Sequence, residues 1–510
     1  MLIANRGEIA LRIIRTCRDL GIETIAVYSD ADADAAHVAA ADAAVRIGPA
    51  PAGESYLRGD RIIEAALATG AEAIHPGYGF LSERAAFARA VTEAGIAFVG
   101  PRPAAIEALG DKLAARRTAL AADVPVVPGT FDAARTDRAN DVDAIVTAAE
   151  RVGYPLLVKA AAGGGGRGMR RVAAPEGLPA ALVAGAAEAL AAFGDGAVYL
   201  EHEIRPARHI EVQLLGDDRG NVVALGERDC SIQRRHQKLV EETPAPGLTG
   251  EERTELHAMA VRAAMAAGLH NAATAEFLFD SDRRFWFLEV NARLQVEHGV
   301  TELVTDLDLV AEQLYIAAGE SLSDAVHAAA SAVAEPGRHA IEIRLAAEDP
   351  ARDFAPVPGR VGRWSMPSGP GVRVDTAIRP GDRVPPDYDP MIAKVMTVGR
   401  DRRIALRRMR RALAEVVVSG IQTTLPFDRA LLDDPAFAQV DGSTLSTDWV
   451  AERWDGPAAR GRVADTAAVA AATAAAETGS TSSLRKDTPE ERPSGWRTTG
   501  RAAAMDQWPR

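Results

Sequence analysis

The residues best suited to bind a phosphate lie at positions 159–169, where four consecutive glycines stand between Lys159 and Arg167. Consecutive glycines let the backbone adopt positive φ angles and turn several N–H groups toward an anion, and the two cations add charge. No Gly-Lys-Ser/Thr sequence follows, so the segment is not a Walker A loop. A flexible linker is the alternative, but linkers rarely follow an apolar strand directly, as this segment follows 155–158.

A predicted β-hairpin brings two carboxylates together. If its turn is symmetric and centred just after Asp282, Glu276 lies directly opposite Glu289, and the twofold period places Phe287, Glu289 and Asn291 on one face. Facing carboxylates destabilise a strand pair unless a cation neutralises them. The pattern therefore predicts an Mg²⁺ site with Asn291 as a third oxygen ligand. A surface pair neutralised by arginine is the alternative.

Two further polar stretches, 209–213 and 227–238, flank a predicted turn. The first alternates polar and apolar residues, which is typical of a strand with one polar face. The second is rich in charge, and His236 and Lys238 share one side if the chain is extended there. An anion-binding site and a solvated charged face are both compatible with this pattern.

The stretch from Asn291 to His298 continues the predicted metal-binding strand. The twofold period groups Asn291 with Arg293, Gln295 and Glu297. Arg293 can bind a planar oxyanion through two parallel hydrogen bonds, and Glu297 can act as a base beside it. A structural salt bridge between Arg293 and Glu297 is the alternative.

Short β-branched runs alternate with amphipathic helical runs through residues 1–111, which predicts a doubly wound parallel sheet. The predicted strands are Leu2–Ala4, Thr24–Ser29, Ala43–Ile47, Ala71–His75 and Ile96–Gly100. Asn5–Gly7 follows the first strand, but the absence of a G-x-G-x-x-G pattern argues against a dinucleotide site. His75–Gly79 follows the fourth strand, where open α/β sheets expose functional side chains; a rigid Pro/Gly turn is the alternative.

The rest of the chain divides by pattern into three parts. Residues 112–334 mix hairpins with helices, and 335–447 form a second mixed α/β segment with an Arg-rich helix near 402–417. Residues 455–510 are dominated by Ala, Gly, Ser, Thr and Pro, which predicts a disordered tail. The fold class is therefore a combination of α/β and α+β.

Composition sets limits on function. A chain of 510 residues has room for three or four domains, and its net charge of −13 argues against a broad nucleic-acid or anionic-membrane surface. Its two cysteines, Cys17 and Cys230, have no zinc-ligand spacing and fit a reducing cytosol. We expect no signal peptide and no strongly apolar stretch of about 18 residues. Only five of the 58 basic residues are lysines.

Taken together, these motifs resemble those of the biotin carboxylase subunit of biotin-dependent acyl-CoA carboxylases, in the ATP-grasp superfamily. The resemblance covers about residues 1–447 and rests on motifs in the family's order: IANRGEIA (3–10), HPGYGFLSE (75–83), GDK (110–112), GGGGRGM (163–169), ERDCS (227–231), QRRHQK (233–238), NARLQVEH (291–298) and AEDP (347–350). The sequence departs from the commonest pattern at Ala162, Glu203 and Gly299, none of which removes a functional group.

The resemblance implies four regions: an N-terminal doubly wound domain (1–111), a central ATP-grasp domain (112–334) with a mobile lid at about 131–204, a C-terminal mixed α/β domain (335–447) and a disordered tail (455–510). It also implies a role for each matching residue. ATP is contacted by Lys112, Lys159, Gly164, Gly165, Gly166, Glu201, Ile204, His209, Gln233 and His236. Mg²⁺ or Mn²⁺ is held by Glu276, Glu289 and Asn291. Bicarbonate is bound by Lys238, Arg293, Gln295 and Val296 and deprotonated by Glu297, and biotin lies beside Tyr78 and Arg344.

The implied reaction is the ATP- and bicarbonate-dependent carboxylation of biotin through carboxyphosphate, as the first half-reaction of an acetyl- or propionyl-CoA type carboxylase in fatty acid metabolism. No A-M-K-M biotinylation motif is present, so we expect separate chains for the biotin carrier protein and for the carboxyltransferase subunit. The resemblance further implies a cytoplasmic homodimer. The alternatives are another bicarbonate-phosphorylating ATP-grasp ligase, or a catalytically inactive scaffold of a carboxylase complex.

Overall fold

The computed structural model describes residues 1–136, 139–161, 168–439, 442 and 444–461. These residues fall into a first unit, Met1–Gly456, and a second, Pro457–Arg510, which is described only as far as residue 461. Most of the predicted disordered tail and the predicted ATP-binding residues Gly164, Gly165 and Gly166 lie outside the described residues.

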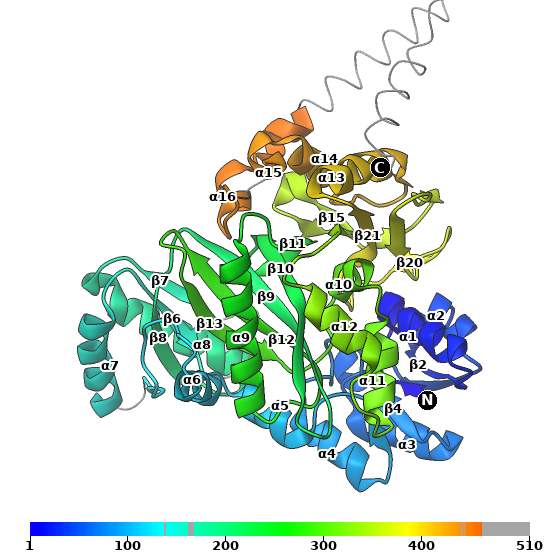
Figure 1. Ribbon diagram of the computed structural model, residues 1–510, viewed down its shortest axis with the longest axis horizontal. Helices are drawn as coiled ribbons and strands as arrows, with labels where there is room; N and C mark the ends of the chain where they lie inside the picture. Colours follow the sequence, from blue (N-terminus) through cyan, green and yellow to red (C-terminus); the bar gives the residue numbers. More distant parts are fainter. Residues whose placement is uncertain (137–138, 162–167, 440–441, 443, 462–510) are drawn as a thin grey trace, which may run out of the picture. The chain divides into compact units, whose positions relative to one another are not determined.

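The N-terminal segment forms a five-stranded parallel sheet in the order β3-β2-β1-β4-β5 (Figure 1). Its strands are β1 (Leu2–Ile3), β2 (Ile25–Ser29), β3 (Ala43–Gly48), β4 (Ala73–His75) and β5 (Ala97–Phe98). Its helices are α1 (Gly7–Asp19), α2 (Ala36–Ala40), α3 (Gly59–Thr69) and α4 (Ala85–Glu93). The prediction of a doubly wound sheet is confirmed. The strand order reverses between β1 and β4, so the loops after these two strands lie next to each other at the switch point.

A single eight-stranded sheet carries most of the remaining structure, in the order β13-β12-β9-β10-β11-β14-β21-β19. Its strands are β9 (Ala207–Gly216), β10 (Val222–Arg234), β11 (Gln237–Thr243), β12 (Asn271–Asp280), β13 (Phe285–Asn291), β14 (His339–Ala346), β19 (Val372–Asp375) and β21 (Met391–Gly399). Because β11 pairs with β14, the central and C-terminal segments share one sheet. The sequence pattern did not predict this continuity.

Helix α9 (Gly250–Ala266) covers one face of the central part of this sheet. It starts at a capping box, in which the Thr249 side chain accepts from the Glu252 backbone and Glu252 bonds back to Thr249. Its buried Leu256 and Met259 belong to the same core as Val212 on β9. The sheet is therefore a rigid support for side chains on its other face.

A second, three-stranded sheet, β7-β6-β8, lies within the predicted lid. It consists of β6 (Leu156–Ala160), β7 (Arg170–Val172) and β8 (Val198–His202), with α7 (Ala139–Val152) and α8 (Leu178–Phe193) packed against it. Contrary to our expectation, the segment Pro175–Phe193 is long and apolar enough to cross a membrane by length and composition. One helix of this kind does not establish a membrane span. Its Leu178 and Leu182 are buried against the three-stranded sheet.

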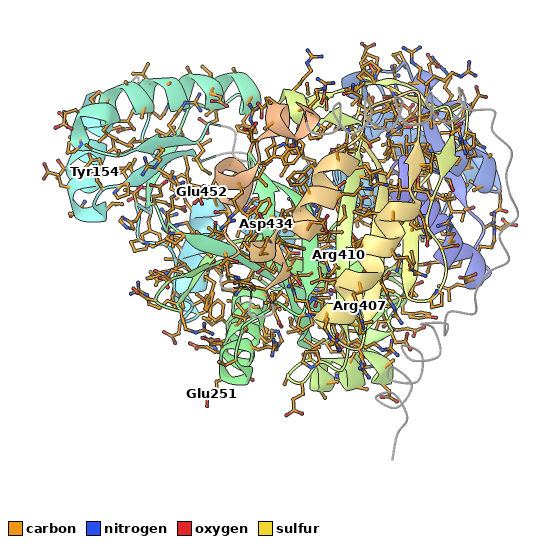
Figure 2. All side chains as sticks on the ribbon, turned by 90° about the horizontal axis from the view of Figure 1, so that it is seen from above. Tyr154, Glu251, Arg407, Arg410, Asp434 and Glu452 are labelled. Carbon is orange, nitrogen blue, oxygen red and sulfur yellow. The ribbon has the colours of Figure 1, made fainter. Side chains whose placement is uncertain are left out.

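The C-terminal part of the large sheet packs against the predicted Arg-rich helix, α13 (Arg402–Glu415). Figure 2 shows Arg407 and Arg410 along this helix, and the buried Leu406 and Met409 lie in the C-terminal core. The other helices are α5 (Pro103–Gly110), α6 (Lys112–Ala121), α10 (His298–Thr305), α11 (Leu309–Ala317), α12 (Asp324–Ala332), α14 (Leu425–Asp433), α15 (Pro435–Ala438) and α16 (Trp449–Arg453). The other strands are β15 (Glu348–Asp349), β16 (Ala355–Pro356), β17 (Gly359–Arg360), β18 (Trp364–Ser365), β20 (Arg383–Val384) and β22 (Val417–Val418).

Candidate active site

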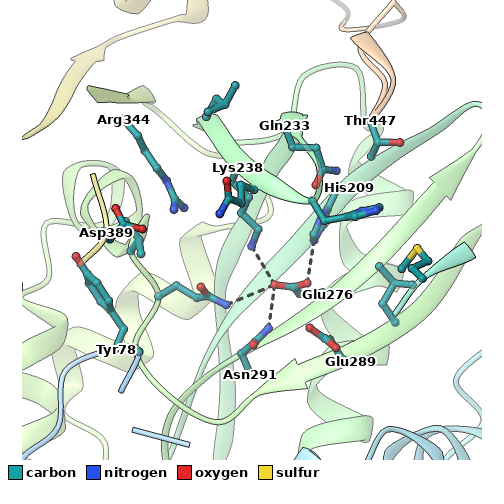
Figure 3. A pocket seen from close by; sticks show the side chains of 18 of the residues that line it. Tyr78, His209, Gln233, Lys238, Glu276, Glu289, Asn291, Arg344, Asp389 and Thr447 are labelled. Atoms are coloured by element: carbon teal, nitrogen blue, oxygen red, sulfur yellow. Dashed lines mark hydrogen bonds and ion pairs between the residues drawn. The ribbon is translucent and has the colours of Figure 1, made fainter. Parts of the chain in front are cut away.

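One cavity of about 1150 Å³ collects the predicted functional residues from all three segments of the first unit (Figure 3). Among the described residues, every predicted site residue except Glu297 lines this cavity. The side chain of Glu297 is fully buried behind the wall, where it contacts Lys238 and Arg344. The volume suits a nucleotide together with a small second substrate.

The turn that carries Tyr78 is fixed by Asn5 from the neighbouring loop. The Asn5 amide donates to the carbonyls of Pro76 at 2.7 Å and Tyr78 at 2.8 Å. Gly77 has a φ of +63°, and a Cβ atom there would lie 2.9 Å from the Asn5 amide nitrogen. The Tyr78 hydroxyl in turn donates to the Glu8 carboxylate. The His75–Gly79 segment is thus a rigid turn that also presents a side chain to the cavity.

The carboxylate hairpin has the predicted pairing but a different local register. Glu276 does face Glu289, yet Phe277 faces Phe287, so the turn is centred on Asp282 itself. A β-bulge between the two pairs inserts Leu288 as an extra residue and restores the predicted alignment. The prediction that Phe287 shares a face with Glu289 is therefore wrong: Phe287 is buried against Phe277, at 5.8 Å between ring centroids.

Glu276 lies among four nitrogen groups (Figure 3). Its carboxylate is 2.9 Å from Lys238 Nζ and 3.1 Å from His209 Nε2, and it accepts from the amides of Asn291 at 2.9 Å and Gln295 at 3.4 Å. Although burial alone would raise the pKa of Glu276, Lys238 and His209 hold it well below its usual range. Burial lowers the pKa of His209, but the Glu276 carboxylate outweighs this effect and raises it.

The predicted metal ligands Glu276, Glu289 and Asn291 all line one cavity and carry oxygen atoms, which suit a hard cation. The Asn291 oxygen accepts from Arg293 at 3.1 Å, while its amide nitrogen faces Glu276. Glu289 lies 3.5 Å from Lys112. Within the described part of the chain, His209, Glu211 and Glu276 also form a group whose possible metal-ligand atoms all lie within 4.8 Å of one another. The two facing carboxylates therefore have cationic partners that a bound divalent ion would replace.

Lys238 is the centre of the charge network. Its ammonium contacts three carboxylates: Glu211, Glu276 at 2.9 Å and Glu297 at 2.8 Å. Burial lowers the pKa of Lys238, but the three carboxylates outweigh it and raise the pKa well above its usual value. Lys238 and the neighbouring Arg344 likewise hold the pKa of Glu297 well below its usual range against the effect of burial.

Sequence reasoning gave no role to two residues beneath Lys238. Glu211 is fully buried and also binds the fully buried Arg228, at 2.6 Å. Arg228 further donates to Gln213 at 2.9 Å and to Thr301 at 2.8 Å. The polar face predicted for residues 209–213 was the signal for Glu211, since alternation places it beside His209 and Gln213.

The segment after Asn291 is not a strand, so its predicted twofold period is wrong. Strand β13 ends at Asn291, and the chain continues through a bend and a turn into α10. The predicted residues still converge: Arg293 donates to Gln295 at 2.8 Å and binds Glu83 at 2.7 Å. Glu297 pairs with Lys238 and Arg344, so the structure does not support the alternative of an Arg293–Glu297 bridge.

Arg344, which the sequence analysis predicts to lie beside biotin, is held by two carboxylates. Arg344 contacts Glu241 at 2.5 Å and Glu297 at 2.9 Å. Burial raises the pKa of Glu241 to about 7, with Glu297 adding to the rise and Arg344 opposing it. Arg344 is therefore fixed at the cavity wall by the predicted base Glu297 and by Glu241, which the sequence analysis did not identify.

The described residues that are predicted to bind ATP line the part of the cavity between the three-stranded sheet and the large sheet. Lys159 binds Glu201 at 2.5 Å, and Arg116 holds the other oxygen of that carboxylate. His236 lies in a tight turn between β10 and β11, with a φ of +63°, so it is not in the extended conformation that would place it beside Lys238. Ile204, Gln233 and His236 line the same end of the cavity.

Gly299, where the family often has proline, follows the turn that carries Glu297. A Cβ atom at this position would lie 2.4 Å from the sulfur of Met396, which is itself fully buried. Met396 on β21 therefore occupies the space that a side chain at position 299 would need.

A three-stranded sheet and a larger antiparallel sheet enclose a cavity in which lysines are paired with carboxylates, and this arrangement is typical of an ATP-grasp enzyme. Comparisons with known protein families show to which family within this class the chain is similar. Residues 1–106 match "Biotin carboxylase, N-terminal domain", 111–325 match "Carbamoyl-phosphate synthase L chain, ATP binding domain", and 342–452 match "Biotin carboxylase C-terminal domain".

Individual relatives agree with these matches. The biotin carboxylase of Nostoc sp. is 48% identical over 444 residues, which cover 87% of this chain and 97% of that protein. The solved biotin carboxylase domain dimer of Hydrogenobacter thermophilus 2-oxoglutarate carboxylase, in complex with MgADP, ADP and bicarbonate, superposes with a TM-score of 0.83 at 43% identity, covering 88% and 96%. The solved biotin carboxylase subunit of a pyruvate carboxylase superposes with a TM-score of 0.73 at 44% identity, covering 88% and 97%. The chain belongs to the biotin carboxylase family.

Proposed function

We propose that this chain is the biotin carboxylase subunit of an acyl-CoA carboxylase of the acetyl- or propionyl-CoA type. Its substrate is biotin attached to a separate carrier protein, and a separate carboxyltransferase subunit completes the reaction. The observation that carries the proposal is the single cavity that joins phosphate-binding lysines, facing carboxylates and the Lys238 network to Tyr78 and Arg344.

In this proposal, Lys112 and Lys159 bind the phosphates of ATP, with Glu201, Ile204, His209, Gln233 and His236 around the nucleotide. Gly164, Gly165 and Gly166 complete the phosphate site. Glu276, Glu289 and Asn291 hold Mg²⁺ or Mn²⁺, which neutralises phosphate charge when bound. The lysines orient the γ-phosphate toward the bicarbonate subsite.

Bicarbonate binds at Lys238, Arg293, Gln295 and the Val296 backbone, and Glu297 removes its proton. A bicarbonate oxygen attacks the γ-phosphorus, and the bond to the β,γ-bridging oxygen breaks, giving carboxyphosphate and ADP. Carboxyphosphate then splits into CO₂ and phosphate. Phosphate takes the proton of the biotin ureido nitrogen, whose electron pair captures CO₂, while Tyr78 and Arg344 hold the biotin ring and its enolate oxygen.

The deciding experiment measures ADP release by the purified chain with bicarbonate, with and without free biotin. We expect turnover to require bicarbonate and to rise when biotin is added. Stimulation by ammonium instead of biotin would identify a different ATP-grasp ligase, and no turnover with any acceptor would identify an inactive scaffold.

The acyl-CoA assignment needs its own experiment, because relatives include a 2-oxoglutarate carboxylase domain and a pyruvate carboxylase subunit. Purification with the native partners, followed by carboxylation assays, compares acetyl-CoA, propionyl-CoA, pyruvate and 2-oxoglutarate. Carboxylation of only the last two would contradict the assignment.

The proposal also includes the domain limits 1–111, 112–334 and 335–447, a cytoplasmic location and a homodimer. The relative from Hydrogenobacter is a dimer, which supports the last point. Light scattering of the purified chain is expected to give twice the mass of 53.8 kDa. A monomer mass at micromolar concentration would contradict it.

A further inference from the structure

Lys394 on β21 is a lysine to which no role has been assigned. Its side chain is fully buried and lies outside the cavity wall. A buried ammonium is costly unless it is paired and hydrogen-bonded. The partners that satisfy it therefore indicate what the lysine positions.

Its shortest contact is to the backbone of the bicarbonate subsite. Lys394 Nζ donates to the carbonyl oxygen of Val296 at 2.7 Å. Val296 lines the cavity and directly precedes Glu297, in the turn that leads into α10. This turn is also held by His298 Nδ1, which lies 2.8 Å from the carbonyl of Gln295. A change at Lys394 thus acts on the position of the Val296 peptide and of the Glu297 carboxylate.

A second contact connects Lys394 to the biotin side. The ammonium lies 3.4 Å from the Oε1 atom of Glu8, and the same Oε1 atom accepts the hydrogen bond of the Tyr78 hydroxyl. Lys394 and Glu8 together therefore link Tyr78 from the N-terminal segment to Val296 in the central segment. Both of these linked residues lie at the cavity wall.

The remaining surroundings keep the lysine charged. Asp375 lies 3.9 Å away and is itself bound to Arg373 at 2.7 Å. Burial alone lowers the pKa of Lys394, but Glu8, Glu342 and Asp375 outweigh it and raise the pKa. An ammonium group is a compact donor, and on a β-strand it is a rigid support for a peptide carbonyl.

From these contacts we infer that Lys394 is a positioning residue, which holds the Val296–Glu297 turn against the Glu8–Tyr78 pair and so sets the bicarbonate subsite beside the biotin subsite. This inference rests on the proposed roles of Val296, Glu297 and Tyr78. Carboxyphosphate formed in a displaced turn releases CO₂ away from the biotin nitrogen, where water competes. The expected signature is therefore ATP cleavage that no longer yields carboxybiotin.

The test is Lys394→Met, which keeps an unbranched side chain, one atom shorter than lysine, and removes the ammonium. A small displacement near the reacting atoms costs up to about 100-fold in rate. We expect kcat/KM for bicarbonate to fall by about 10- to 100-fold and the ratio of ATP cleaved to carboxybiotin formed to rise severalfold. KM for ATP is expected to stay within about threefold, since Lys394 contacts none of the proposed nucleotide residues.

The matched control is Arg253→Met, which removes a buried cation that binds Glu227 at 2.7 Å and does not line the cavity. It is expected to lower the melting temperature without changing the ATP-to-carboxybiotin ratio. An unchanged ratio and unchanged bicarbonate kinetics in folded Lys394→Met would overturn the inference. If that variant does not fold, Glu8→Gln decides, because it keeps an acceptor for Tyr78 but removes the charge facing Lys394; an unchanged ratio there overturns it as well.

Glu297→Gln in the same assay separates this inference from the proposed function. Full turnover in Glu297→Gln means that the bicarbonate subsite itself is wrongly assigned. Loss of turnover in Glu297→Gln combined with wild-type coupling in Lys394→Met means that only the role of Lys394 is wrong.

Discussion

The substitution Glu297→Gln separates the proposed base from the groups around it. The amide has the same shape but neither accepts a proton nor neutralises Lys238 and Arg344, at 2.8 and 2.9 Å. Loss of a general base costs about 10²- to 10⁴-fold in rate, or roughly 3 to 5.5 kcal/mol of activation free energy. Lys238 keeps two of its three carboxylate partners, Glu211 and Glu276, so we expect the metal and nucleotide side to persist.

The assay is bicarbonate-dependent carboxybiotin formation over a range of pH, together with equilibrium binding of MgATP. We expect kcat to fall at least about 100-fold while the Kd for MgATP changes less than about threefold, a difference below about 1 kcal/mol. Residual turnover should rise with pH, because more of the substrate is then already deprotonated. A merely positional role for Glu297 predicts no such rise.

The matched control for this prediction is Glu227→Gln. Glu227 is a buried carboxylate that binds Arg253 and His257 and does not line the cavity. It measures the general cost of removing a buried carboxylate, and its kcat should stay near that of the wild type. Glu297→Gln with kcat within about tenfold of the wild type would refute the assignment of the base.

Three further predictions concern the metal site, the sheet and the chain end. Glu276→Gln should raise the Mg²⁺ concentration for half-maximal turnover at least about tenfold, measured by magnesium titration at fixed nucleotide; an unchanged midpoint would exclude Glu276 as a ligand. Glu242→Gln should lower the free energy of unfolding by about 3 to 5 kcal/mol, because it removes the charge of a buried carboxylate that Arg402 binds at 2.6 Å and that His339 contacts at 2.8 Å. Arg402 and His339 lower the pKa of Glu242 to about 2 despite its burial, so this stabilisation exists above its ordinary pKa of 4.5 and is lost as the pH falls toward 2. Denaturant unfolding from about pH 6 to pH 2 should therefore show a flatter pH dependence in Glu242→Gln than in the wild type. Truncation after Gly456 should preserve turnover. Truncation before Trp454 should lower the melting temperature, because Trp454 packs on Phe427 at 5.1 Å between ring centroids. Equal melting temperatures for the two truncated chains would contradict this prediction.

Local periodicity identified the facing carboxylates because side-chain direction in a strand depends only on position along it. Counting from a symmetric turn placed Glu276 opposite Glu289, and the structure has this pair. The bulge at Leu288 preserves the pair and turns Phe287 into the core. A bulge follows from twist and packing, and no residue type in the hairpin marked it. The same arithmetic failed beyond Asn291, where the strand ends and the chain bends.

The partners of Lys238 show what sequence pattern cannot supply. Its three carboxylates come from β9, β12 and the turn before α10, at separations of 27, 38 and 59 residues. Each of these contacts depends on which strands become neighbours in the large sheet, whose order β12-β9-β10-β11 brings Glu211 and Glu276 toward Lys238. The family resemblance assigned roles to Lys238, Glu276 and Glu297 but not to Glu211, and only the folded sheet gives the contacts between them.

The charge balance of the site follows from these contacts. In a chain of net charge −13, the cations that face the cavity are paired with carboxylates: Lys112 with Glu289, Lys159 with Glu201, Lys238 with three acids, Arg293 with Glu83 and Arg344 with Glu241 and Glu297. An anionic substrate that binds here must therefore replace carboxylate contacts, because an additional negative charge beside an intact pair is repelled by the acid. Selectivity then depends on how readily each acid finds another partner. Lys238 is best suited to such an exchange, since releasing one of its three acids leaves it still paired and still charged.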